Sequence, residues 1–417
     1  MNGTAPKTHR VAVTGIGVLS PLGIGLETLW AGVLAKRSAV RTIDRFDPAP
    51  FDSHVAAQLD GFDPADFLAP KRVRWTDRYA QFALASAHLA LADAKLDLSE
   101  RGDDSGVYIG SALGGLSYAE EQHDRFLANG IRAVRPLLAI AVFGGAGTTQ
   151  VAIEFGLRGP NVANANSCAA GTVAIGEAFR AIARGEVRVA LAGGAEAPLS
   201  PLVFGSFAII RAMSTRNDDP AHASRPFDRD RDGFVMAEGS AVLVLERYED
   251  ALARDARIYG EVAGFGLTAD AHHMTAPLPE GKSSSRAMCA AIAEAGLVPD
   301  EIELIDAHGS SSPLNDATET RAIHSTFGAA ATRIPVMASK GNHGHALGAS
   351  GAWEAALTLL AMERRTLPPL ANIENVEPAC DLDLVLETRS CSPRIALSNS
   401  TGFGGINAAL VLRAADA

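Results

Sequence analysis

The chain has 417 residues, of which 47% are apolar and 20% charged, and its formal net charge is −11. This length and composition are typical of a globular protein with two domains or one large duplicated domain. The acidic balance argues against nucleic acid as a partner, because phosphate binding needs clustered lysines and arginines. The first residues are polar, and the apolar runs are broken by glycine and shorter than the roughly 18 residues of a membrane span. We therefore expect a cytoplasmic protein without a signal peptide and without membrane contact.

Short β-rich runs alternate with alanine-rich segments of helical spacing along the whole chain. We expect strands at 10–18, 105–113, 187–197, 240–249, 259–268, 303–309, 394–405 and 408–414, and helices at 77–96, 173–186, 282–297 and 352–365. This alternation predicts an α/β protein, and runs that are apolar throughout suit strands buried on both faces. A charged segment near Asp255 divides the elements into two sets, which we assign to residues 1–255 and 256–417. No internal repeat is strong enough to demonstrate a duplication.

One cysteine stands among small residues in the stretch NANSCAAGT, at the head of the predicted helix 173–186. The partial positive charge of a helix N-terminus favours the thiolate, so Cys168 is a candidate nucleophile. A free cysteine also packs well as a small apolar residue, and the local pattern alone leaves this alternative open. The four cysteines of the chain are scattered, which argues against a disulfide framework or a structural zinc site.

A first histidine segment reads IDAHGSSSPLNDATET. His308 follows an apolar strand and precedes a loop of glycine and serine, the kind of place where active-site loops of α/β proteins gather. Asp316 and Glu319 then open a predicted helix, because acidic residues favour the first turn.

A second segment, MASKGNHGHALGASGAWEAA, threads Lys340, His343 and His345 through glycines. Such residues supply donors for a developing anion, and the glycines let the backbone approach a ligand closely. The spacing H-x-H could also indicate a metal, but no carboxylate or cysteine cluster joins it.

The third segment is SNSTGFGGINAAL, in which residues 402–405 form the run GFGG. It lacks the spacing and the lysine of a phosphate-binding P-loop, and the early GIGVLSPLGIG does not fit a dinucleotide fingerprint. A tight turn with exposed backbone N–H groups is the better interpretation, and such a turn can form half of an oxyanion hole. A thiol, histidines, a lysine and an amide turn together suit acyl transfer through a thioester.

Many ordered motifs then make the chain recognisable, namely VAVTGIGVLSPLG, FGLRGPNV, AGGAEAPLSP, AMSTRNDDP, ASRPFDRDRDGFVMAEGSAVLVLE, AHGSSSPLNDATE, GHALGASGAWEA and GFGGINAAL. Over essentially its whole length the chain resembles the β-ketoacyl-acyl carrier protein synthases of the thiolase superfamily, most closely synthase II. The resemblance implies the thiolase fold, with two similar halves in a five-layered α-β-α-β-α sandwich. It also implies an acyltransferase that condenses a cysteine-bound acyl chain with malonyl-acyl carrier protein and extends the chain by two carbons.

The resemblance carries site roles over residue by residue. Cys168 matches the acyl-accepting nucleophile, His308 and His345 the two catalytic histidines, and Lys340 the lysine that supports the site electrostatically. His343 falls outside this histidine pair. The residues expected at the pantetheine arm are Ser310 and Ser312, and those expected at the oxyanion hole and the acyl gate are Thr401, through its amide, and Phe403.

The same resemblance implies partners and an ion. Acyl carrier protein is the expected partner, on a basic docking surface formed by Lys71, Arg74, Arg132 and Arg211. The chain is expected as a homodimer or as a heterodimer with a chain-length-factor homologue. No organic cofactor is implied, since the substrates carry phosphopantetheine. The resemblance also implies either a structural monovalent cation or an ordinary hydrogen-bond network near Asp306, Glu354, Ser398 and Asn399.

Two departures from the synthase II pattern bear on the pathway. Thr401 stands where fatty-acid synthases II usually carry a gating phenylalanine, and a small residue there is more like the ketosynthase subunits of type II polyketide synthases. The sequence NSC also replaces the common TAC before the helix. A polyketide ketosynthase working with a chain-length factor is therefore the main alternative. A cysteine hydrolase using Cys168 and His308, or a scaffold that only binds acyl carriers, would not need the complete set of catalytic residues.

Overall fold

The computed structural model describes residues 8–415, which form two sheets of the same design joined edge to edge. The first contains β1 (Val11–Ser20), β5 (Ser105–Gly110), β6 (Asn161–Asn164), β7 (Val189–Glu196) and β9 (Gly239–Arg247), in the order β6-β5-β7-β9-β1. The second contains β10 (Gly260–Ala269), β11 (Leu304–Asp306), β12 (Pro335–Met337), β16 (Ile395–Gly402) and β17 (Ile406–Ala414), in the order β12-β11-β16-β17-β10.

These two orders are identical when the strands of each set are numbered along the chain. The directions agree as well: β5 is parallel to β6 and β7 and β11 is parallel to β12 and β16, whereas the last two pairings of each set are antiparallel. The chain is thus a structural duplication, which the sequence alone could not demonstrate. The edges of β1 and β10 pair over Val11–Val13, so that both sheets belong to one hydrogen-bonded array.

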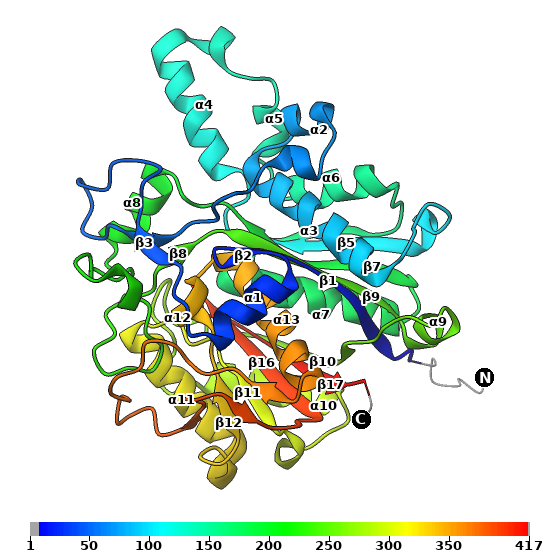
Figure 1. The fold of residues 1–417 in the computed structure, drawn as a ribbon, viewed down its shortest axis with the longest axis vertical. Coiled ribbons are helices and arrows are strands. Elements are labelled where there is room, and N and C mark those ends of the chain that lie inside the picture. The colour runs from blue at the N-terminus through cyan, green and yellow to red at the C-terminus, as the bar shows by residue number, and fades with distance from the viewer. Residues whose placement is uncertain (1–7, 416–417) are drawn as a thin grey trace.

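Helices complete five layers (Figure 1). Helices α7 (Ala170–Ala183) and α13 (Ser350–Glu363) lie between the two sheets, α3 (Arg78–Ala94) and α6 (Ala146–Phe155) cover the outer face of the first, and α10 (Lys282–Glu294) and α11 (Pro313–Phe327) cover the second. This is the α-β-α-β-α sandwich predicted from the resemblance.

The central layer explains the many small residues of the sequence. Helix α13 is buried on all sides over Ser350–Met362, because it has a sheet on either face and α7 beside it. The two helices approach so closely at Gly171 that a Cβ atom there would lie 2.8 Å from the carbonyl oxygen of Gly348. Small residues at this crossing therefore bring the N-termini of both central helices together, and these N-termini position the functional site.

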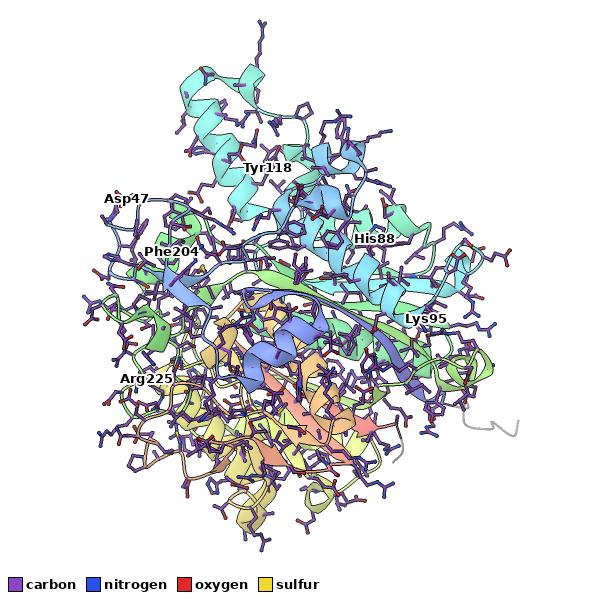
Figure 2. All side chains as sticks on the ribbon, in the orientation of Figure 1. Asp47, His88, Lys95, Tyr118, Phe204 and Arg225 are labelled. Carbon is purple, nitrogen blue, oxygen red and sulfur yellow. The ribbon has the colours of Figure 1, made fainter. Side chains whose placement is uncertain are left out.

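Two short strands extend these sheets, because β14 (Asp383–Leu384) pairs in parallel with β12 and β2 (Gly23–Ile24) pairs with β1. Most of the other elements surround the sandwich. These other elements are α1 (Leu26–Leu34), β3 (Val40–Thr42), β4 (Val55–Ala57), α2 (Pro70–Arg74), α4 (Leu116–Asn129), α5 (Leu138–Ala141), α8 (Pro201–Ile209), β8 (Met236–Ala237), α9 (Tyr248–Ala253), α12 (Lys340–His343), β13 (Thr366–Leu367) and β15 (Arg389–Ser390). Helix α4, which carries Tyr118, projects beyond the rest of the molecule (Figures 1 and 2). Among the described residues, no helix combines the length and apolar character that crossing a membrane requires.

Candidate active site

A cavity of about 300 Å³ collects the predicted catalytic residues Cys168, His308 and His345. One part of its wall is apolar, and the rest is polar. The apolar part comes from Phe207, Ile210, Phe234, Leu347 and Phe403, and the polar part includes Ser310, Ser312, Asn315, Thr401 and Asn407. Phe204 on α8, labelled in Figure 2, belongs to the apolar cluster that also contains Cys168. The site thus combines a reactive centre with room for an apolar chain.

Cys168 lies in a 3₁₀ turn, Ser167–Ala169, that leads directly into α7, and its side chain is buried. Ser167 has a φ of 52°, so the backbone makes a sharp elbow just before the cysteine. Burial raises the pKa of the Cys168 thiol to about 11, while the Ser167 hydroxyl, Lys340 and the backbone N–H of Phe403 act in the opposite direction. The Ser167 hydroxyl lies 3.8 Å from the sulfur. The prediction of a cysteine at a helix head is confirmed.

The two histidines face each other edge to face, with ring centroids 5.1 Å apart. Burial, followed by the positive charge of Lys340, lowers the pKa of both rings well below its usual value, so both are neutral at pH 7. Lys340 Nζ lies 3.3 Å from Nδ1 of His308. Because an ammonium group only donates, this Nδ1 accepts, and the ring hydrogen of His308 resides on Nε2.

His345 contacts a residue that the sequence prediction missed. Its Nδ1 lies 2.8 Å from Oγ of Ser350, the first residue of α13. With the serine hydroxyl as donor, Nε2 of His345 also carries its hydrogen. A serine five residues after a histidine, at a helix start, is the only sequence signal of this contact.

The loop that carries His308 is held by Glu319 of α11. One carboxylate oxygen accepts from His308 N at 2.6 Å and from Asn399 Nδ2 at 2.7 Å, and the other accepts from Gly309 N at 2.9 Å. Burial raises the pKa of Glu319 to about 7 despite these donors. The predicted helix start with Asp316 and Glu319 is confirmed, and its role is to fix the histidine loop.

Residues 402–405 form the tight turn expected from GFGG, between β16 and β17, and Gly404 and Gly405 have positive φ values of 85° and 72°. The backbone N–H of Phe403, an amide of this turn, lowers the pKa of the Cys168 thiol against the effect of burial. The sequence predicts the second oxyanion amide at Thr401. Thr401 lies within β16, paired with Asn407 of β17, and lines the cavity together with Phe403, so its role in the oxyanion hole stays a prediction.

The comparisons with known proteins agree with this geometry. Residues 8–251 match the family model described as the β-ketoacyl synthase N-terminal domain, and residues 259–374 match the C-terminal domain. The chain belongs to the β-ketoacyl synthase family. It is 43% identical over 409 residues to a 3-oxoacyl-[acyl-carrier-protein] synthase 2 from Synechocystis sp., covering 98% of each chain. It is 42% identical over 408 residues to the enzyme of the same name from Coxiella burnetii, covering 97% of this chain and 99% of the relative.

Solved structures add a second group of similar proteins. One is a type II polyketide acyl-carrier protein in complex with its ketosynthase bound to the hexaketide, with a TM-score of 0.91 and 33% identity over 98% of this chain and 100% of that chain. Another is the ishigamide ketosynthase/chain length factor, with a TM-score of 0.91 and 35% identity over 98% and 99% of the two chains. The chain is therefore a condensing enzyme of the acyltransferase class, as predicted.

A buried charged cluster supports the reactive centre of this ketosynthase. Lys340 forms an ion pair with Glu354 of α13 and also donates to the carbonyl oxygen of His308. Burial and the nearby Glu354 carboxylate raise the pKa of Asp306 well above its usual value, and burial raises that of Glu354. The sequence prediction of an electrostatic role for Lys340 thus corresponds to a lysine held between a carboxylate and the first histidine.

His343 has a structural position outside the cavity. Its Nε2 bonds Oγ of Ser339 and its Nδ1 bonds the carbonyl oxygen of Gly344, both at 2.8 Å, and its ring packs on Trp353. Burial lowers its pKa to about 3. Since both ring nitrogens are occupied, the H-x-H spacing does not present a ligand pair for a metal.

The four predicted docking cations are exposed but are not gathered at one place in the site. Arg211, which follows α8, lines the cavity that contains Cys168. Lys71 and Arg74 lie on α2, and Arg132 lies on the short 3₁₀ turn after α4. Arg74 lines a second cavity of about 340 Å³.

Proposed function

We propose that this protein is a β-ketoacyl-acyl carrier protein synthase in which Cys168 is the acyl carrier and His308 and His345 drive the condensation. The observation that carries this proposal is the meeting of the elbow thiol, two neutral histidines and an amide turn in one cavity. We expect the enzyme to act in the cytoplasm on acyl chains delivered by acyl carrier protein.

In the first half-reaction, Cys168 Sγ attacks the thioester carbonyl of an acyl-carrier protein. A new thioester bond forms, the bond to the carrier's sulfur breaks, and the thiol proton ends on that departing sulfur. The backbone amides of Cys168 and Phe403 are the expected donors to the transient oxyanion, and losing one such donor costs about 10²–10³ in rate. Ser310 and Ser312, whose hydroxyl oxygens lie 3.0 Å apart in the cavity wall, are proposed to contact the pantetheine arm.

In the second half-reaction, the bond between the malonyl carbon and its carboxylate breaks, and carbon dioxide leaves. The electron pair stays on the remaining fragment as an enolate, whose oxygen accepts from the Nε2–H groups of His308 and His345. The enolate carbon attacks the Cys168 thioester, a carbon–carbon bond forms, and the thiolate of Cys168 is released. Neutral histidines suit this role because each presents a hydrogen without needing to hold a buried charge.

The buried cluster behind Lys340 fits a monovalent cation. Four buried side-chain oxygens of this cluster have no hydrogen-bond partner among residues 8–415, and they are Oδ1 of Asp306, Oε2 of Glu354, Oγ of Ser398 and Oδ1 of Asn399. Asp306 and Ser398 are direct neighbours on β11 and β16, and the cluster contains two carboxylates against one ammonium group. Oxygen ligands and an excess of negative charge are what a hard cation prefers. We propose that these residues would hold such an ion, which would fix the strand ends on either side of His308.

A second copy of the chain, or a homologous chain-length factor, is the proposed partner along the open edge of the first sheet. Strand β6 is the last strand on this side and pairs only with β5 among the described strands. Large apolar side chains are exposed on β6 and on the elements from α4 to α6, namely Phe126, Leu127, Ile131, Ile140, Val142, Phe143, Ile153 and Val162. An exposed edge with an apolar surround is a typical association surface.

A polyketide ketosynthase is the second candidate, because Thr401 is small and lies in the cavity wall. A wider gate would admit longer, oxidised or polyene chains. Assays of Thr401→Phe with short and long primers test this interpretation, and an unchanged chain selectivity would contradict it.

Intact-mass measurement tests the proposed function directly. The purified chain is incubated with acyl-carrier proteins of several lengths, and malonyl-carrier protein is then added. Acylation of Cys168 followed by an extended β-ketoacyl product supports a self-sufficient ketosynthase, and the preferred primer indicates its pathway. Acylation without extension indicates a missing partner subunit and favours the polyketide interpretation, whereas no acylation at all contradicts the proposal.

A further inference from the structure

A hydroxyl and an amide join the turn that carries Phe403 to helix α11. Thr401 Oγ1 lies 2.7 Å from Oδ1 of Asn315, across 86 residues of sequence. Thr401 lies near the end of β16 and Asn315 lies in the first turn of α11, and both line the cavity of Cys168. The bond therefore spans from one wall of the active site to another.

The hydrogen-bond partners fix the orientation of the Asn315 side chain. Its Nδ2 lies 3.3 Å from Oδ1 of Asp316 and 3.4 Å from Oε2 of Glu319. Both oxygens of the Glu319 carboxyl group already accept from N–H donors, so this group acts as an acceptor here. The NH₂ group of Asn315 therefore faces it, and the carbonyl oxygen faces Thr401. The Thr401 hydroxyl is consequently the donor, and a side chain without a donor at this position would leave Oδ1 of Asn315 without this partner.

Through Glu319 the same amide reaches the first catalytic histidine. The Glu319 carboxylate accepts from Asn315 Nδ2 and also from the backbone N–H groups of His308 and Gly309. Thr401, Asn315, Glu319 and the His308 loop thus form a continuous chain of contacts. Such a chain ties the turn beside the nucleophile to the loop of the histidine that must act on the same substrate.

The turn also has contacts on the side away from α11. Its backbone bonds the loop before α10, where Gly404 N donates to Met274 O at 2.7 Å and Asp270 N donates to Gly405 O at 2.8 Å. On the side of α11 the Thr401 hydroxyl bonds this helix at Asn315, and two residues earlier on β16 the Asn399 amide bonds Glu319 at 2.7 Å. Of these two bonds, the one from Thr401 lies nearer to the turn. The ring of Phe403 stacks on Phe207, with centroids 6.2 Å apart, and this contact can slide without breaking a hydrogen bond.

We propose that Asn315, through the Thr401 hydroxyl, is a positioning residue that sets the place of the Phe403 amide relative to Cys168 and His308. The inference rests on the proposed function for its effect on turnover, and it concerns neither the nucleophile nor the histidines themselves. An oxyanion donor that shifts by a fraction of an ångström stabilises the transition state less, whereas binding of the acyl chain in the apolar part of the cavity stays the same. The expected signature is therefore a loss in kcat with little change in KM.

The test is a double-mutant cycle on the full-length protein with Thr401→Val, Asn315→Ala and the double variant. Valine has nearly the shape of threonine without its donor. Each single variant is expected to lower kcat by about tenfold, since misplacement of a catalytic group costs up to about 10²-fold. KM should stay within twofold, and the double variant should be no slower than the worse single variant, because both remove the same bond. Thr401→Ser returns a hydroxyl and should recover most of the loss.

A matched control removes a threonine hydroxyl outside the site. Thr366 on β13 donates to Arg364 O at 3.0 Å, and Thr366→Val should leave kcat unchanged. Melting temperatures of all variants show whether any of them is unfolded. If the two single losses multiply in the double variant, or if Thr401→Ser is as slow as Thr401→Val, the proposed positioning role is wrong.

A second readout separates this inference from the proposed function. Alkylation of Cys168 by iodoacetamide needs neither a carrier protein nor condensation, and it depends on the Phe403 amide because that amide favours the thiolate. The alkylation rate should fall in both single variants and should fall by the same factor in the double variant. In Thr401→Ser the rate should recover. This pattern in a protein that never condenses would overturn the proposed function and support the positioning role. Normal condensation and alkylation in all variants would overturn the positioning role alone.

Discussion

The N-termini of the two central helices have the same backbone but different chemistry. Helix α7 is preceded by the 3₁₀ turn Ser167–Ala169 and α13 by the turn Leu347–Ala349, and the first residues of these turns have φ values of 52° and 43°. The preceding residues also agree, with φ and ψ of −77° and 40° at Asn166 and of −87° and 39° at Ala346. The duplication thus places Cys168 in one half where the other half has Gly348.

The helices α7 and α13 also differ in the polarity of the side chains at their inner positions. The inner positions of α7 are filled by small or apolar side chains, and Ala174 stands where α13 has Glu354. On α13, Ser350 bonds His345, Glu354 pairs with Lys340, and Thr358 donates to Asp306. One copy of the scaffold therefore presents the nucleophile, and the other copy orients the groups that act on the second substrate.

The largest effect should come from removing the nucleophile, which has no equivalent in the other half. Cys168→Ala is expected to abolish acylation and to lower condensation by at least about 10³-fold, as for other covalent catalysts that lose their nucleophile. The thermal unfolding temperature should change little, because alanine is close to cysteine in size. Intact mass after incubation with an acyl-carrier protein measures the outcome, and an acyl adduct on the variant would place the nucleophile elsewhere.

The next largest effect concerns Glu354, a buried carboxylate that α13 carries and α7 lacks, and its ion pair with Lys340. Lys340→Met leaves the buried Glu354 carboxylate without its partner, and breaking a buried ion pair in this way costs about 3–5 kcal/mol of unfolding free energy. The folded-state pKa of Glu354 and of Asp306 is raised, so the folded protein binds protons more readily than the unfolded chain. The deficit of the variant should therefore shrink as the pH falls and these carboxyl groups become neutral.

Urea unfolding at several pH values measures this dependence. The double variant Lys340→Met with Glu354→Gln provides the control, because it removes the unpaired carboxylate and should be more stable than Lys340→Met alone. A deficit that is the same at every pH would show that the charge is not its cause.

A smaller effect is expected at Gly348, the position of the second half that corresponds to Cys168 in the first. A Cβ atom on Gly348 would lie 2.6 Å from Ala112 N and 2.8 Å from Oε2 of Glu196, which accepts from Gly348 N at 3.0 Å. Gly348→Ala should therefore lower the unfolding free energy by about 1–3 kcal/mol, as overpacking does. Gly144→Ala is the matched control, because nothing lies within 4 Å of a Cβ atom there. Equal stabilities of the two variants in urea would contradict this view of the Gly348 position.

The features of the two halves that can be predicted from the sequence are those that depend on a local residue pattern or on many ordered motifs. The long strands, the cysteine at a helix head and the histidine at a strand end are confirmed. Strands β6 and β12, at corresponding places in the two sheets, are not predicted from the sequence, and they owe their existence to pairing with β5 and β11. The duplication was likewise hidden, since it resides in strand order and backbone angles.

The features of the site that could not be predicted from the sequence depend on contacts between segments far apart in the chain. The bond between Thr401 and Asn315 joins residues far apart in the chain, and nothing in either local pattern indicates it. Assigning the oxyanion amide to Thr401 or to Phe403 depends on the shape of the turn at Gly404 and Gly405, which is set by the loop packed against it. The docking role of the exposed cations stays a prediction.

The smallest effect tests the residue that precedes the nucleophile, where the corresponding residue of the other half is Leu347. The Ser167 hydroxyl lies 3.8 Å from the Cys168 sulfur and lowers the pKa of the thiol against the effect of burial. Ser167→Ala should raise this pKa further and slow alkylation of Cys168 by iodoacetamide at pH 7 by about two- to threefold, because a tenfold change in thiolate corresponds to one pKa unit. The factor should stay the same at every pH below the thiol pKa of both proteins, because the thiolate fraction of each rises with pH in the same way there. Identical pH profiles of alkylation would show that the elbow serves only to place the sulfur, as its counterpart at Leu347 places a backbone amide.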